Sequence, residues 1–158
     1  MQEQKLQFLL NSFPELLRKT DENAERVFGK MNFIQMIEHM SDSIRIANGK
    51  FPHTTIVTPE DRIPAMQDFV RSDRDFKPNT KNILLGEDPE AVKSASKEAA
   101  IQELECELAA FVSHFKDQPG KVQRNPFFGD MDFGLWIDLL YKHAKHHLAQ
   151  FNIQIPNS

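Results

Sequence analysis

The chain has 158 residues, a length typical of a single domain around one hydrophobic core, so residues 1–158 are treated as one domain. Its net charge of −4 and its scattered Lys and Arg residues argue against a nucleic-acid partner, which would require a basic surface. The single cysteine, the absence of a signal-peptide pattern and the absence of a run of roughly 20 apolar residues predict a soluble, cytoplasmic protein with no membrane partner.

The first predicted helical segment contains apolar residues at helical spacing from Leu6 to Leu17. Within it, Ser12 and Glu15 have the spacing of a capping box, and Pro14 lies in the first turn after Ser12. We therefore expect the helix to break or restart near Ser12. A short turn is expected to follow over residues 24–29.

The second helix has the clearest pattern in the chain. Asn32 is a good N-cap, and Gly49 is placed to end the helix. Between them, apolar residues recur every three or four positions, starting at Phe33. His39 lies in the middle of this helix, at the edge of its apolar face.

Residues 51–89 lose this periodicity and hold five of the nine prolines, which predicts a long irregular crossover. One short helix from about Ile63 to Val70, N-capped by Asp61, is expected within it. Residues 54–58 are the best strand candidate in the chain, and they stand alone. Three arginines of the crossover are candidates for holding an anionic group of a substrate: Arg62, Arg71 and Arg74. Simple solvation of these side chains is the alternative.

A third helix is predicted to open at residues 88–90, where an Asp-Pro-Glu sequence is typical of a helix start, and to end by Gly120. Residues 123–130 are expected to form a loop. Asp132 then caps a last helix that runs to about Phe151. Four main helices with a long connection between the second and the third predict an all-α four-helix bundle with a crossover.

The last helix carries three of the six histidines of the chain. His143 and His147 lie one helical turn apart on the same face as Trp136 and Phe151, and two imidazoles so placed can bind one metal ion. This spacing alone is a weak signal, and hydrogen-bonded core histidines are the alternative. Because sites in helical bundles are built from facing helices, His39 is the candidate third ligand. Three protein ligands leave a coordination position open, as in catalytic sites.

Three segments resemble the DinB/YfiT-like metalloenzyme superfamily, and within it a small branch of unassigned function. They are residues 29–40 (GKMNFIQMIEHM), 125–129 (NPFFG) and 143–151 (HAKHHLAQF). The resemblance implies an up-down-down-up four-helix bundle. It also implies three metal ligands, which map onto His39, His143 and His147.

The same resemblance bears on the residues around these ligands. His146 falls on the side of the helix and is expected at the surface or behind the ligands, whereas Gln150 is placed to orient a ligand or to line the pocket. Relatives often carry a histidine where this chain has Asn125, so we expect residues 126–129 to lead structurally into the last helix. His53 and His114 are not expected to be ligands.

The implied function is that of a divalent-metal-dependent enzyme acting on a small-molecule substrate, either a thiol-dependent transferase or a metal-activated hydrolase. Three imidazoles suit zinc, nickel, iron and copper, of which zinc or nickel is favoured here. The alternative is a non-enzymatic helical bundle that binds a ligand or forms a homodimer and retains a vestigial metal site. An open pocket beside the histidines would favour the enzyme, and a Phe or Met plug over them would favour the alternative.

Overall fold

The structure is a computed structural model in which residues 2–78 and 88–156 are described, and it is mostly helical with a small two-stranded sheet. The elements in chain order are α1 (Gln2–Gln7), the π-helix η1 (Phe8–Ser12), α2 (Phe13–Lys19), α3 (Phe33–Ala47), the 3₁₀-helix η2 (Glu60–Arg62), α4 (Ile63–Arg71), α5 (Lys97–Phe115), β1 (Gln123–Asn125), β2 (Gly129–Met131) and α6 (Phe133–Gln150). The predicted all-α fold is confirmed only as a mostly helical one. None of the described helices has the length and apolar character needed to span a membrane.

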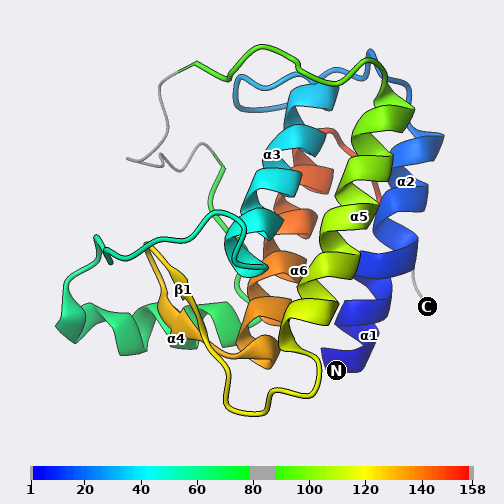
Figure 1. Ribbon diagram of the computed structural model, residues 1–158. Coiled ribbons are helices and arrows are strands. Elements are labelled where there is room, and N and C mark those ends of the chain that lie inside the picture. Colours follow the sequence, from blue (N-terminus) through cyan, green and yellow to red (C-terminus); the bar gives the residue numbers. More distant parts are fainter. Residues whose placement is uncertain (1, 79–87, 157–158) are drawn as a thin grey trace.

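The long helices α3, α5 and α6 lie side by side with the N-terminal segment formed by α1, η1 and α2, whereas α4 and the two strands lie to one side of α6 (Figure 1). The contact between α3 and α5 is the most extensive between any two elements. The largest fully buried side chains belong to all four of these helical segments: Trp136, Phe13, Phe33, Phe111, Leu9, Leu17, Met36, Ile37, Met40, Ile44, Ile101 and Leu104. Burial of these side chains is the main source of stability.

The predicted restart near Ser12 is confirmed as a change from the π-helix η1 to α2 at Phe13, but the predicted capping box at Ser12 is wrong. The backbone at Ser12 is helical, its side chain makes no capping hydrogen bond, and the chain continues from η1 directly into α2. The helix continues because it widens locally: the Phe13 N–H donates to Phe8 O, five residues back. This wider turn accommodates Pro14, which has no N–H of its own and would disrupt a regular helix.

The predicted start of the second helix is confirmed. The Asn32 side chain accepts from the Gln35 N–H at 2.8 Å, and the Gln35 side chain accepts from the Asn32 N–H at 2.8 Å. This reciprocal capping box satisfies two backbone donors that would otherwise lack partners. Gly49 follows the helix with φ +80°, a left-handed conformation that glycine adopts at little cost.

A buried carboxylate connects α3 to α5. Glu107 accepts hydrogen bonds from Arg45 Nε at 2.8 Å, Asn48 Nδ2 at 3.1 Å and Lys50 Nζ at 2.6 Å. The next residue back, Cys106, is exposed. This network fixes α3, which carries His39, against α5.

The short helix predicted in the crossover is confirmed as α4, but its predicted cap is wrong. The residue before α4 is Arg62, which makes no side-chain capping bond, and Asp61 lies within the 3₁₀ turn η2. Pro64 in the first turn needs no N–H partner, so the helix starts without a side-chain cap. The part of the predicted crossover over residues 79–87 lies outside the described residues.

The third long helix starts later than predicted, at Lys97, with Ser96 Oγ accepting from the Ala99 N–H at 3.0 Å. The residues before it instead run across α3. There the Glu38 carboxylate accepts from the backbone N–H of Lys93 at 3.0 Å and of Ser94 at 2.8 Å. These contacts satisfy the backbone donors of Lys93 and Ser94 outside any helix, and the Asp-Pro-Glu sequence at residues 88–90 does not begin one.

The predicted loop over residues 123–130 is instead a hairpin, so the described fold is not purely α-helical. Strands β1 and β2 pair antiparallel, with Arg124 opposite Asp130. The Arg124 Nε donates to Asp130 Oδ1 at 2.8 Å, and Asn125 Oδ1 accepts from the N–H groups of Phe127 and Phe128. A cross-strand ion pair and a side chain that closes the turn stabilise two strands too short to show a period-two pattern.

Residues 54–58, the best strand candidate in the sequence, form no strand. They are held beside the hairpin by two hydrogen bonds: the Val57 N–H donates to Pro126 O at 2.7 Å, and Arg124 Nη1 donates to Thr54 O at 2.6 Å. The hairpin therefore leads into α6 as a braced unit, which agrees with the structural role expected for residues 126–129.

Candidate metal centre

Three histidine side chains from two helices meet at one place. His39 lies on α3, and His143 and His147 lie one turn apart on α6. The Nε2 atom of His143 is 3.1 Å from His39 Nε2 and 2.9 Å from His147 Nε2. The structure thus brings together all three residues predicted from the sequence as ligands, with ligand atoms within 4.8 Å of one another.

The site lies mostly inside the protein. His147 is buried, whereas His39 and His143 are half-buried. Burial lowers the pKa of all three imidazoles, that of His147 to about 3, and repulsion from neighbouring histidines lowers each of them further. The three rings are therefore neutral near pH 7, the protonation state in which histidine binds metals.

The spacing of the three nitrogens suits a cation better than a hydrogen-bond network. A neutral imidazole nitrogen carries either one proton or one lone pair, so His143 Nε2 can make a well-aligned hydrogen bond to only one of its two neighbours. The second close pair of nitrogens is then not joined by a well-aligned hydrogen bond. Nitrogens at about 2.0–2.1 Å from a tetrahedral zinc ion lie about 3.3 Å apart, close to the 3.1 Å and 2.9 Å that separate His143 Nε2 from His39 Nε2 and His147 Nε2. The donor set fits a divalent ion.

One face of the site is lined by aromatic rings. The Phe76 ring centroid is 6.3 Å from that of His143 and 5.9 Å from that of His146, and Phe28 lies 5.2 Å from His146. His146 is half-buried and does not join the three ligand nitrogens, as expected from its place on the side of the helix. Phe76 belongs to the crossover, so the crossover contributes one aromatic ring to the surroundings of His143.

The sequence did not point to Phe28 or Phe76. Both lie in irregular segments, where no periodicity indicates which way a side chain points. The crossover arginines that were singled out are all exposed. Arg71 pairs with Asp68, and the Arg74 guanidinium lies over the Phe69 ring. Neither of these two contacts involves the three histidines.

Two other residues discussed from the sequence, His114 and Gln150, have hydrogen-bond partners. His114 Nε2 lies 2.9 Å from Gln123 Oε1 at the base of the hairpin, and His53 is half-buried in the crossover. Gln150 contacts a ligand, as was expected of it: its Oε1 lies 2.8 Å from His147 Nδ1.

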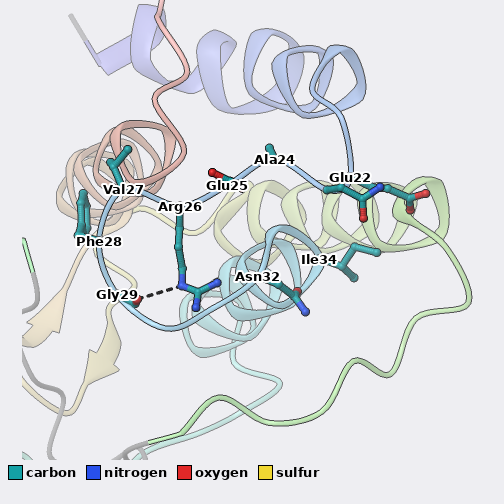
Figure 2. A pocket seen from close by; sticks show the side chains of 10 residues that line it. Glu22, Ala24, Glu25, Arg26, Val27, Phe28, Gly29, Asn32 and Ile34 are labelled. Atoms are coloured by element: carbon teal, nitrogen blue, oxygen red, sulfur yellow. Dashed lines mark hydrogen bonds between the residues drawn. The ribbon is translucent and has the colours of Figure 1, made fainter.

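A hollow of about 610 Å³ lies along residues 22–29 and the start of α3, and none of the three histidines lines it. Figure 2 shows Arg26 reaching back to Gly29, where its Nε donates to the Gly29 carbonyl at 3.0 Å. The hollow is lined mainly by polar groups of an exposed loop, in contrast to the buried histidine cluster.

Comparisons with protein-family models, curated proteins and solved structures find no match to this chain. The interpretation of the three histidines as a metal centre therefore rests on their geometry.

Proposed function

We propose that this protein binds one divalent metal ion through the Nε2 atoms of His39, His143 and His147 and acts as a metal-dependent enzyme on a small molecule. The observation that carries the proposal is the approach of His143 Nε2 to within 3.1 Å and 2.9 Å of the other two nitrogens. Zinc or nickel is the proposed ion, because both accept imidazole ligands. A reducing, cytoplasmic setting is part of the proposal.

Membership of the DinB/YfiT-like superfamily, with its up-down-down-up bundle, is part of the same proposal. Two features support it. The long connection between α3 and α5 allows both helices to run in the same direction, and in Figure 1 both begin at the end of the bundle where α2 and α6 finish. The three histidines that the resemblance implies as ligands also lie close together.

The proposed chemistry divides between the ion and the protein. When bound, a divalent ion with three protein ligands supplies Lewis acidity, which lowers the pKa of a thiol or a water at its open position. His39, His143 and His147 would hold the ion through neutral nitrogens. The Phe76 ring beside His143 provides apolar surface near the three histidines, which suits an apolar part of a substrate. A thiol-dependent transferase is the preferred class, and a hydrolase uses the same arrangement with water.

One observation favours a second candidate, a non-enzymatic ligand-binding or dimerising bundle with a vestigial metal site. The Phe76 ring lies against both His143 and His146, as a plug over the site would. Under this alternative the protein still binds a metal, but small thiols cannot reach it. Access of a substrate therefore distinguishes the two candidates.

Metal analysis followed by a thiol-conjugation screen tests the proposal. Protein purified without chelator is expected to contain close to one zinc or nickel ion per chain by elemental analysis. The loaded protein is then expected to consume a small thiol in the presence of an electrophilic acceptor. Protein that neither retains nor takes up a divalent ion would overturn the proposal. Full metal loading with no thiol consumption and no hydrolysis across the panel would favour the vestigial site.

A further inference from the structure

We infer that Gln150 is a positioning residue: its amide holds His147 in the tautomer protonated on Nδ1, so that the bare lone pair of Nε2 faces the site. The inference deepens the proposed function, and its effect on metal affinity rests on that function. The tautomer itself is a property of the metal-free protein and can be measured without any ion.

The orientation of the Gln150 amide follows from its two partners. Its Nε2 lies 3.1 Å from Phe28 O, and its Oε1 lies 2.8 Å from His147 Nδ1. A backbone carbonyl can only accept a hydrogen bond, so the NH₂ end of the amide must face Phe28. The opposite orientation would set two oxygens against each other at this distance. Gln150 is 3% exposed, so solvent has little access to relieve such a clash.

The proton on His147 follows from that orientation. The amide oxygen of Gln150 can only accept, so His147 Nδ1 must carry a proton and donate it. A neutral imidazole has one ring proton, and therefore His147 Nε2 carries a lone pair. This is the nitrogen that lies 2.9 Å from His143 Nε2. Metal-binding histidines commonly donate their second ring N–H to an acceptor behind them, which fixes both the tautomer and the ring orientation.

The carbonyl that orients the amide is itself fixed by the loop. The Val27 N–H donates to Gln150 O at 2.7 Å, which ties the loop to the end of α6. Arg26 Nε donates to Gly29 O at 3.0 Å, the bond drawn in Figure 2. Gly29 has φ +77°, and a Cβ there would lie 2.6 Å from Gln150 Nε2. The loop therefore approaches Gln150 as closely as only a glycine allows.

The test compares two substitutions. Gln150→Leu removes both ends of the amide, whereas Gln150→Glu, as a protonated carboxyl, keeps an acceptor for His147 Nδ1–H and a donor for Phe28 O. Gln102→Leu, on the exposed side of α5, is the matched control. The tautomer is read in metal-free protein from ¹⁵N chemical shifts and ring ¹H–¹⁵N correlations of His147. Affinity is read by calorimetric titration with Zn²⁺.

We expect wild-type protein and Gln150→Glu to show the Nδ1–H tautomer, and Gln150→Leu to show a mixture with Nε2–H. We expect Gln150→Leu to lower Zn²⁺ affinity about 10–100-fold, the usual effect of losing such a partner, and the control to leave it unchanged. An Nε2–H tautomer of His147 in wild-type protein would overturn the inference even if Gln150→Leu fails to fold. Unchanged tautomer and affinity in Gln150→Leu would also overturn it. A wild-type protein that shows the Nδ1–H tautomer but binds no Zn²⁺ would instead count against the proposed function alone.

Discussion

Replacing His143 by alanine is expected to abolish metal binding and to leave a folded helical protein. His143 Nε2 is the nitrogen that lies within 3.1 Å of His39 Nε2 and 2.9 Å of His147 Nε2. Without it, two ligands remain on different helices. Loss of a direct ligand should cost more than the roughly 100-fold that marks the upper range for a residue behind a ligand. The fold should persist, because the buried Phe, Leu and Ile side chains carry most of the apolar burial.

Zn²⁺ titration and far-UV circular dichroism of the same His143→Ala sample measure the two parts of this prediction. His53→Ala, a substitution at a half-buried histidine in the crossover, is the control and should bind Zn²⁺ as the wild type does. Unchanged Zn²⁺ affinity in His143→Ala would show that the ion, if any, binds elsewhere. An unfolded metal-free wild type or an unfolded variant would identify the ion as structural and weaken the case for an enzyme.

Metal-free protein is expected to lose stability as the pH falls below about 6.5, the ordinary pKa of histidine. The pKa values of His39, His143 and His147 are lowered in the folded state, that of His147 to about 3. In the unfolded state these groups regain their ordinary pKa and bind more protons than the folded protein does, so acid favours unfolding. The free energy of unfolding of the metal-free protein is therefore highest above about pH 6.5 and decreases progressively below it. At pH 5, His147 alone should cost roughly 2 kcal/mol.

Urea unfolding of chelator-treated protein at several pH values between 7 and 5 measures this slope. The range stops above the ordinary pKa of carboxyl groups, because the lowered pKa of the buried Glu107 would add a loss of its own in stronger acid. His147→Gln should flatten the slope, whereas Gln102→Leu, which removes no titratable group, should not. A free energy of unfolding that stays constant from pH 7 to pH 5 would show that the three rings are not held neutral by burial.

Much of this fold could be predicted where local chemistry and periodicity agree. The Asn32 cap, the Gly49 end and the apolar period place α3 within a residue of its observed bounds. The predictions that failed lie where distant contacts decide. The backbone N–H groups of Lys93 and Ser94 are bound by Glu38 of α3, a contact that no local signal at residues 88–90 reveals.

The candidate metal centre also has features that the sequence could predict and features that it could not. The spacing of His143 and His147 fixes their common helix face, and the apolar stripe around His39 indicates that this residue is near the interior. The convergence of the three rings needed the packing of α3 on α6, which a sequence can only suggest. Phe76 and the carbonyl of Phe28 come from irregular segments, so neither the aromatic wall nor the acceptor that orients Gln150 could be predicted.

A crystal structure of the protein grown with Zn²⁺, with anomalous data collected at the zinc edge, tests the central proposal most directly. The expected result is one strong anomalous peak about 2.0–2.2 Å from the Nε2 atoms of His39, His143 and His147, with a coordination position left for a non-protein ligand. A map with no peak among these three nitrogens, at a Zn²⁺ concentration that saturates the protein in solution, would contradict the proposal.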